Sequence, residues 1–241
     1  MHRKEPVMKR ILSALLAAFL LASCAPALDG GAKEPASSSQ ATSPVPTAPG
    51  LLAQEDGKLN PGCRSELDYR LIPLQEDGPS DFSRFGAQDA AGNAVDESIL
   101  EGHLTLFHLW ASYCGTEVED MRILGKLAEK YAGEGLQVIG VPMDAVDPYG
   151  EPLENAQALV EDIQRLSGSG DLQLFPSQDL ITIKLKDVTT VPTVFFVGED
   201  GKIVSKQDYT GPRGEAEWEE IIKAELEHYR LAQQPETSRE E

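Results

Sequence analysis

The stretch from Leu104 to Met121, LTLFHLWASYCGTEVEDM, constrains the fold more than any other part of the chain. Its first half is a short apolar run, which is typical of a fully buried strand. The capping-type residue Thr116 and the acidic residues from Glu117 onward then indicate a helix N-terminus. Cys114 lies at the corner between them. A helix N-terminus favours the thiolate over the thiol, so we expect the pKa of Cys114 to be lowered.

The segment WASYCGTE resembles the WAxWCGPC signature of thioredoxin-like proteins, in their membrane-tethered TlpA/ResA branch. The resemblance implies an α/β, thioredoxin-like fold, in which a central mixed β-sheet is flanked by helices and preceded by an N-terminal β-hairpin extension. It also implies thiol–disulfide exchange. Glu117 stands where the family has its second, resolving cysteine, and Thr116 stands where it usually has proline. This motif therefore supplies only half of the usual dithiol.

Hydrophobic patterning elsewhere is that of short strands and amphipathic helices. A turn at residues 91–93 predicts a hairpin within residues 82–99, and weak alternation favours an extra strand within residues 64–78. We expect the further strands at residues 136–143, 172–175, 191–197 and 202–206, and the helices at residues 118–131, 153–166, 177–185 and 215–231.

Residues 1–23 have the features of a signal peptide. Basic residues precede an apolar stretch at residues 11–22, which is shorter than the ~20 residues that a membrane-spanning helix needs. The stretch ends in Leu-Ala-Ser-Cys24, which resembles a bacterial lipobox. That resemblance implies cleavage before Cys24, lipidation of its sulfur, and attachment to the extracytoplasmic face of the cell membrane. An ordinary secretory peptide is the alternative.

The rest of the chain divides by composition. Residues 24–59 are rich in Ala, Ser, Pro and Gly, which predicts a disordered tether. Residues 60–232 are then a thioredoxin-like domain of ordinary size, followed by a polar tail at residues 233–241. The net charge of −19 over 241 residues argues against nucleic acid as a partner.

The chain has three cysteines. If Cys24 carries lipid, Cys63 and Cys114 remain as thiols. Cys63 lies in the turn-like segment NPGCR, before the domain proper. It is either an unconventional resolving thiol, which requires its Cα atom to lie within ~7 Å of that of Cys114, or a free or structural cysteine unrelated to catalysis. We favour the second interpretation.

The tripeptide Val191-Pro192-Thr matches the family's cis-proline segment. The resemblance implies a cis Val191–Pro192 bond that faces Cys114, with the backbone of Val191 pairing with an extended substrate strand. Ordinary placement of a proline at the start of a strand is the alternative. The candidate substrate contacts are Trp110, Tyr113, Gly115, Val191 and Pro192.

Two further residues are candidate catalytic groups beside Cys114. His108 falls where thioredoxins have a buried acid, and is either a proton acceptor or a core histidine bonded to a backbone carbonyl. Asp120 falls where the tethered branch has a glutamate that tunes the cysteine; alternatively, it is a solvated acid that stabilises the helix. A charged Glu117 opposes ionisation of Cys114 but suits the helix N-terminus, and the sequence leaves this balance open.

Three functions are compatible with these features: a thiol–disulfide oxidoreductase with Cys114 as its single nucleophile, a dithiol enzyme that uses Cys63, and a redox-inactive peptide-binding module. The sequence favours the first. The expected partners are extracytoplasmic protein thiols or disulfides and a membrane electron donor. We expect no cofactor, and no metal site, because the histidines lack metal-ligand spacing with the cysteines.

Overall fold

The structure is a computed structural model that describes residues 63–64, 68–72, 74, 77–147 and 150–234. The expected signal peptide, the lipidation residue Cys24 and the tether lie outside the described residues. No helix in the described part of the chain is both long enough and apolar enough to cross a bilayer.

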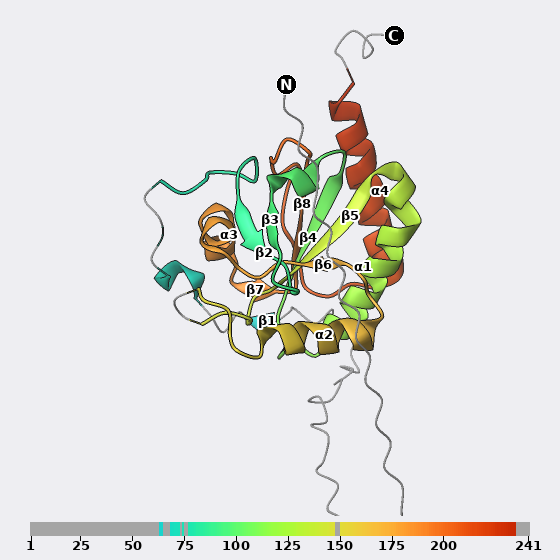
Figure 1. Ribbon diagram of the computed structural model, residues 1–241. Coiled ribbons are helices and arrows are strands. Elements are labelled where there is room, and N and C mark those ends of the chain that lie inside the picture. The colour runs from blue at the N-terminus through green and yellow to red at the C-terminus, as the bar shows by residue number, and fades with distance from the viewer. Residues whose placement is uncertain (1–62, 65–67, 73, 75–76, 148–149, 235–241) are drawn as a thin grey trace, which may run out of the picture. The chain divides into compact units, whose positions relative to one another are not determined.

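A five-stranded mixed sheet forms the centre of the fold, in the order β6-β5-β4-β8-β9 (Figure 1). The central strand β4 (Leu104–Trp110) pairs in parallel with β5 (Leu136–Pro142) and antiparallel with β8 (Thr193–Val197). The outer strands are β6 (Leu172–Gln173) and β9 (Tyr209–Thr210). Every residue of β4 is buried, as expected for a strand covered on both faces. This is the predicted thioredoxin-like α/β fold.

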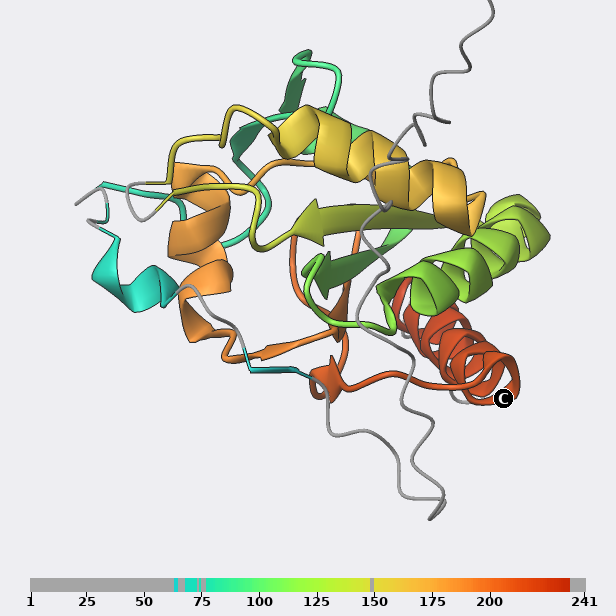
Figure 2. The same cartoon turned by 90° about the horizontal axis from the view of Figure 1, so that it is seen from below.

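Helices α1 (Glu117–Tyr131) and α4 (Glu215–Ala232) lie side by side on one face of the sheet (Figures 1 and 2). Alternate residues of β4 face these helices because successive strand side chains point to opposite faces. The buried residues of this layer are Leu104, Leu106, Ile123, Leu124, Leu127, Tyr131, Leu136, Val138, Val194, Phe196, Trp218, Ile222 and Leu226.

The opposite face is covered by α3 (Gln178–Ile183) and by the chain that precedes β4. Phe107 and Phe195 stack here with ring centroids 5.3 Å apart, and Phe82 packs on both rings. Helix α2 (Ala156–Ser167) packs along α1. The short 3₁₀ helices are η1 (Tyr69–Leu71), η2 (Glu97–Leu100), η3 (Ala132–Glu134) and η4 (Leu185–Asp187).

The predicted N-terminal hairpin is confirmed as β2 (Gly86–Gln88) and β3 (Ala94–Asp96). Its turn is held by the carboxylate of Asp89, which accepts hydrogen bonds from the backbone amides of Ala91 and Asn93 and from the Asn93 side chain. A short acidic side chain that binds nearby amides is a local device for reversing the chain.

Two predicted strands differ from the structure. Among the described residues of 64–78, Arg64 alone lies in a strand, as the second residue of β1 (Cys63–Arg64), while the Asp68 side chain accepts a hydrogen bond from the Arg70 amide and starts η1. The strand expected at residues 202–206 is reduced to a single bridge between Val197 and Ile203.

The ladder beside β8 is interrupted by a side chain. The Ser205 hydroxyl, in place of a backbone carbonyl, accepts the hydrogen bond from the Phe196 amide. The strand that pairs with β8 further along is β9, at Tyr209–Thr210.

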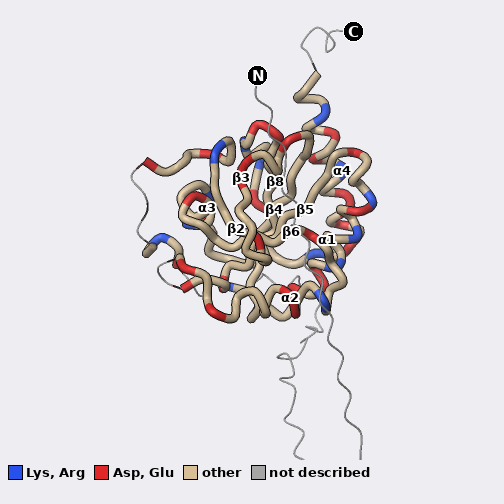
Figure 3. The backbone as a smooth tube through the Cα atoms, in the orientation of Figure 1, with Lys and Arg blue, Asp and Glu red and all other residues tan. Residues whose placement is uncertain are grey.

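Acidic residues occur on each of the four α-helices of the described chain, with fewer basic residues among them (Figure 3). Lys126 of α1 pairs with Glu215 of α4 at 2.6 Å, and Lys130 pairs with Glu219 at 2.8 Å. These lysines are exposed, so each pair contributes no more than about 1 kcal/mol to stability. The apolar layer beneath them therefore holds the two helices together.

Gly140 of β5 allows a test of how closely the Gln173 side chain, on the edge strand β6, packs against β5. A Cβ atom at this position overlaps the side-chain amide of Gln173, which accepts a 2.9 Å hydrogen bond from the indole Nε1 of Trp110. We expect Gly140→Ala to displace that amide and to lower the free energy of unfolding by about 1–3 kcal/mol in chemical denaturation.

The matched control is Gly133→Ala, because no atom lies within 4 Å of a Cβ atom at this position. We expect it to change stability by less than about 1 kcal/mol. Equal effects of the two substitutions would contradict the close packing of Gln173 on β5.

Candidate active site

Cys114 lies in the tight turn that joins β4 to α1. Its amide donates to the carbonyl of Ala111 at 3.0 Å, and its own carbonyl accepts from the Glu117 amide at 3.2 Å. The Cys114 side chain is only 1% exposed. Thr116 is the N-cap residue, but its side chain caps no amide; its hydroxyl oxygen lies 3.9 Å from Cys114 Sγ.

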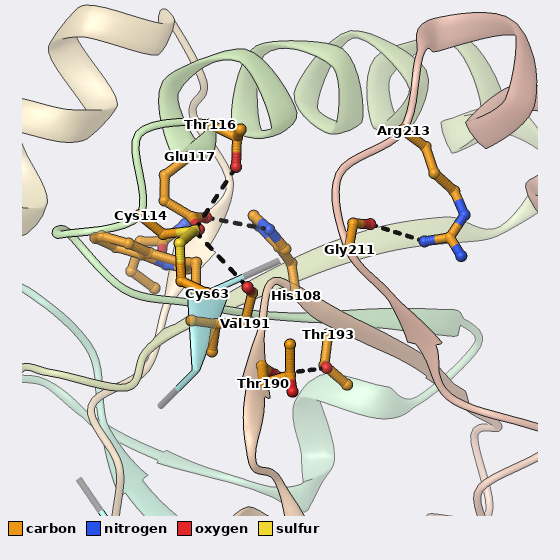
Figure 4. Close-up of polar contacts among 12 residues, drawn as sticks. Cys63, His108, Cys114, Thr116, Glu117, Thr190, Val191, Thr193, Gly211 and Arg213 are labelled. Atoms are coloured by element: carbon orange, nitrogen blue, oxygen red, sulfur yellow. Dashed lines mark hydrogen bonds and ion pairs between the residues drawn. A yellow bond between two sulfur atoms is a disulfide. The ribbon is translucent and has the colours of Figure 1, made fainter. Parts of the chain in front are cut away.

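Cys63 and Cys114 are joined by a disulfide (Figure 4), with Cα atoms 5.8 Å apart and a sequence separation of 51 positions. A free Cys63 is therefore excluded in this structure, whereas a structural role and a resolving role are both compatible with the disulfide. The sequence does not reveal this pairing, because residues so far apart are brought together only by the tertiary fold.

Cys63 is placed by main-chain pairing as well as by its sulfur. Strand β1 runs antiparallel to β7 (Thr190–Val191), with Cys63 opposite Val191 and Arg64 opposite Thr190. The Tyr113 hydroxyl donates a hydrogen bond to the Arg64 carbonyl at 3.3 Å. The predicted substrate residues Tyr113 and Val191 thus contact the chain's own β1 in this structure.

The Val191–Pro192 peptide bond is cis, as predicted. The carbonyl oxygen of Val191 lies 3.7 Å from Cys114 Sγ, which places the loop against the disulfide. The loop is held by the Thr193 hydroxyl, which donates to the Thr190 carbonyl at 2.8 Å, and by the Gly211 amide, which donates to the Pro192 carbonyl at 2.9 Å. Neither Thr193 nor Gly211 was predicted from the sequence to be a site residue.

His108 and Glu117 meet beneath Cys114, between β4 and the first turn of α1. His108 Nε2 lies 3.7 Å from Glu117 Oε2, and the two side chains are each 2% exposed (Figure 4). Burial lowers the pKa of His108 to about 3, so its imidazole is neutral at pH 7.

Burial also favours the neutral form of Glu117. Burial, reinforced by the nearby carboxyl groups of Asp120 and Asp144, raises the pKa of Glu117 well above its usual value, although the Ala111 amide opposes this. A neutral carboxyl adds no full negative charge beside the sulfur of Cys114. The opposition of Glu117 to thiolate formation, which the sequence leaves open, is therefore weak in this structure.

Asp120 is 1% exposed, so the interpretation of this residue as a solvated first-turn acid is wrong. Burial raises its pKa to about 6, and the backbone amide of Arg213 and the indole of Trp218 offset part of this effect. Its proposed tuning of Cys114 stays a prediction.

The remaining site residues lie at different depths. Trp110 is fully buried, and its indole is bound to Gln173, so it packs beneath the site without reaching the surface. Gly115 is exposed at the tip of the turn.

Asp144 holds the turn before Cys114 in place and was not predicted from the sequence. Its carboxylate accepts hydrogen bonds from the Ser112 amide at 2.9 Å and from the Ser112 hydroxyl at 2.5 Å, and so fixes the turn two residues before Cys114. Asp144 comes just after the predicted strand at residues 136–143. Because the carboxyl ends of neighbouring parallel strands lie at the same edge of a sheet, this position indicates a place near the turn that holds Cys114.

The arrangement contains the parts that thiol–disulfide exchange needs: a sulfur at a helix N-terminus, a second sulfur bonded to it, and a fixed main-chain edge beside both. Within the described ranges, no three His, Cys, Asp or Glu side chains are grouped in a way that would hold a metal ion.

Comparisons with known proteins bring out two kinds of relative, and no family model matches the chain. A protein of Mesembryanthemum crystallinum, described as a probable phospholipid hydroperoxide glutathione peroxidase, is 28% identical over 149 residues, which cover 54% of this chain and 84% of that protein. A protein of Arabidopsis thaliana with a similar description is 38% identical over 64 residues, which cover 27% of this chain and 28% of that protein.

Solved structures similar to this one include a thioredoxin-family thiol:disulfide interchange protein from Chlorobium tepidum, with 17% identity and a TM-score of 0.48 over 63% of this chain and 99% of that one. StoA from Bacillus subtilis has 20% identity and a TM-score of 0.43 over 60% of this chain and 99% of that one. The assignment of the fold rests on this chain's own strand order and register.

The buried carboxyl of Asp120 leads us to predict how the stability of the protein depends on pH. Its pKa rises from 3.8 to about 6 on folding, so between these values the folded chain binds more protons than the unfolded chain. The contribution of the Asp120 carboxyl to the free energy of unfolding is therefore fully present below about pH 4. It is lost as pH rises through about 6, and the full difference is about 3 kcal/mol. We expect Asp120→Asn to flatten the decline in unfolding free energy between pH 4 and pH 7 by up to this amount, as measured by denaturant titration at each pH.

The control is Asp162→Asn, because the Asp162 side chain on α2 is 67% exposed. This substitution should leave the slope of stability against pH unchanged. An unchanged slope in Asp120→Asn as well would contradict the proposed protonation of Asp120.

Proposed function

We propose that this protein is a thiol–disulfide oxidoreductase in which Cys114 is the nucleophile and Cys63 is the resolving cysteine. The observation that carries the proposal is the Cys63–Cys114 disulfide beside the cis-proline loop. It favours the dithiol alternative over a single-cysteine route, because the second sulfur is supplied by β1 and not by residue 117.

The exchange balances in two steps. In the dithiol form, the Cys114 thiolate attacks a substrate disulfide, forming a mixed disulfide and releasing one substrate sulfur as a thiolate that takes up a proton. The Cys63 thiolate then attacks Cys114 Sγ, which releases the second substrate sulfur and re-forms the Cys63–Cys114 bond. Two electrons pass to the substrate, and an external dithiol restores the starting state by reducing the Cys63–Cys114 bond and becoming a disulfide itself.

The surroundings of Cys114 suit this role. The N-terminus of α1 stabilises a thiolate, while the neutral states of Glu117 and His108 keep full charges away from it. Glu117 occupies the usual position of the resolving cysteine but has no sulfur. It therefore cannot close a disulfide with Cys114, which leaves that step to Cys63.

A second candidate is reduction of hydroperoxides, and the relatives described as hydroperoxide peroxidases favour it. Here the Cys114 thiolate attacks the peroxide oxygen, which breaks the O–O bond, releases an alkoxide and leaves a sulfenic acid. Attack by the Cys63 thiolate then expels hydroxide and forms the same disulfide. The two candidates differ in the oxidant and share both cysteines.

Single-cysteine variants test the proposed roles. Cys114→Ser should abolish exchange with a model disulfide, whereas Cys63→Ser should complete the first step and accumulate a mixed disulfide on Cys114, seen by intact mass. Intramolecular thiols act at effective concentrations of the order of millimolar, so with micromolar external thiol we expect turnover in Cys63→Ser to fall about a thousandfold.

The matched control is Glu117→Cys in the Cys63→Ser background, which places a resolving thiol at the usual position and should restore turnover. Activity retained in Cys114→Ser, or full turnover in Cys63→Ser, would overturn the assignment. Treating the reduced protein with hydroperoxide separates the two candidates, because only the second predicts rapid disulfide formation and a sulfenic acid in Cys63→Ser.

We further propose that the protein is exported, anchored by lipid on Cys24, and active on extracytoplasmic protein thiols or disulfides with electrons from a membrane donor. The basic and apolar residues before Cys24 and the lipobox-like tetrapeptide support this. In a bacterial host, we expect Cys24→Ala to move the protein out of the membrane fraction and to remove an acyl-labelled band. Equal membrane association of both forms would contradict lipid anchoring.

A further inference from the structure

Arg213 lies in the segment that joins β9 to α4, and its charged side chain is only 17% exposed. Its Nε atom pairs with Glu217 at 2.8 Å, and its guanidinium carbon lies 5.1 Å from the ring centroid of Trp218 and 5.8 Å from that of Tyr209. An Nη1 hydrogen is donated to the Gly211 carbonyl at 2.8 Å (Figure 4). The ion pair and the two rings hold the rigid guanidinium in the position that makes this bond.

Gly211 links Arg213 to the cis-proline loop. The Gly211 amide donates to the Pro192 carbonyl at 2.9 Å. Gly211 is buried and has a φ angle of 87°, which glycine adopts readily and a residue with a side chain does not. Because glycine has little conformational preference of its own, a contact has to hold its backbone in place. The hydrogen bond from Arg213 to the carbonyl of the same residue supplies that restraint.

The position of the loop matters to Cys114 because of one carbonyl group. The Val191 carbonyl oxygen lies 3.7 Å from Cys114 Sγ. In the dithiol form this sulfur carries a hydrogen, and the Val191 oxygen is an acceptor for it. A hydrogen bond donated by the thiol favours the thiol over the thiolate. The distance between the loop and the sulfur therefore affects how readily Cys114 ionises.

We propose that Arg213 is a positioning residue of the active site, and that its guanidinium, acting through Gly211, holds the Val191–Pro192 loop at its distance from Cys114. Through this loop, Arg213 limits the fraction of Cys114 that is present as thiolate. The inference rests on the proposed exchange function, in which the Cys114 thiolate attacks the substrate disulfide, and it adds a residue from outside the Cys114 turn.

An ordinary surface ion pair with Glu217 is the alternative role for Arg213. The Glu217 side chain is 45% exposed, so this pair alone is weak, and it gives no reason for the guanidinium to bind Gly211. The two roles predict opposite effects on Cys114 when the guanidinium is removed. Loss of a positive charge by itself disfavours a nearby thiolate, whereas release of the Val191 carbonyl favours it.

Arg213→Met tests the inference, because methionine keeps an unbranched stem against the two aromatic rings but has no hydrogen to donate to Gly211. The full chain also carries Cys24→Ser and Cys63→Ser, so that Cys114 is its only thiol. Ionisation is followed by the ultraviolet absorbance of the thiolate against pH. At a fixed pH below the pKa of Cys114, we expect the thiolate fraction to rise about two- to tenfold, the effect of losing one hydrogen bond.

Arg213→Lys is a second variant that keeps the positive charge. One ammonium group cannot reproduce the fork that binds Glu217 and Gly211 together, so the thiolate fraction should rise here as well. The titratable and charged side chains around the site are the same in all variants: Arg64, Tyr69, His108, Tyr113, Glu117, Asp120, Asp144 and Glu217.

The matched control is Lys184→Met in the same background. Lys184 is 15% exposed, pairs with Asp208 at 2.9 Å and lies 5.3 Å from the ring centroid of Phe195, so it is also a mostly buried cation held by a carboxylate and a ring. This variant removes a charge and leaves the bond from Arg213 to Gly211 intact. We expect its thiolate fraction to be unchanged or lower.

Hydrogen exchange gives an independent readout of the link. The Gly211 amide should exchange faster in Arg213→Met than in Lys184→Met. A thiolate fraction that is unchanged or lower in Arg213→Met, or an equally protected Gly211 amide, would overturn the inference and leave the proposed function standing. A Cys114 that ionises as expected but forms no mixed disulfide would overturn the proposed function and leave the effect of Arg213 on ionisation standing.

Discussion

Burial of β4 on both faces is the constraint on which the site depends. A strand sealed between α1 and α4 on one side and the phenylalanine layer on the other has no freedom to shift register, so the residue at which it ends is fixed. The turn that follows is tied to β5 through Asp144 and leads directly into α1. Cys114 therefore meets the helix N-terminus and the Val191–Pro192 loop without any contribution from flexible segments.

Glu117 shapes the interior beside Cys114. Its carboxyl lies in the first turn of α1, where a charged form is costly because it has lost its water. The structure accommodates the group in its neutral form beside a neutral His108. The two side chains fill the space as polar, uncharged groups, and the disulfide partner of Cys114 lies on β1, outside the five-stranded sheet.

Local patterns in the sequence predict the fold well. The apolar run of β4, the spacing of α1 and α4, and the turn residues of the β2–β3 hairpin each specify their own conformation, and the cis-proline segment is identified by resemblance. The predicted strand at residues 202–206 does not form a continuous ladder, because the Ser205 side chain replaces a backbone acceptor. The alternation of apolar residues in the sequence does not reveal such a replacement.

The partners of the site residues are harder to predict from sequence. The disulfide joins residues separated by 51 positions, and the solvated and buried alternatives for Asp120 are decided by the packing of α4, which is distant in sequence. The same limit applies to Trp110, whose burial under Gln173 cannot be foreseen from its place in the motif.

The two residues joined by the disulfide differ in exposure. Cys114 is 1% exposed, whereas Cys63 is partly exposed on β1. In the proposed exchange, the more exposed Cys63 is the residue that an external thiolate attacks, and Cys114 is expelled as the leaving group. The external dithiol and the substrate then react at different sulfurs of the same bond.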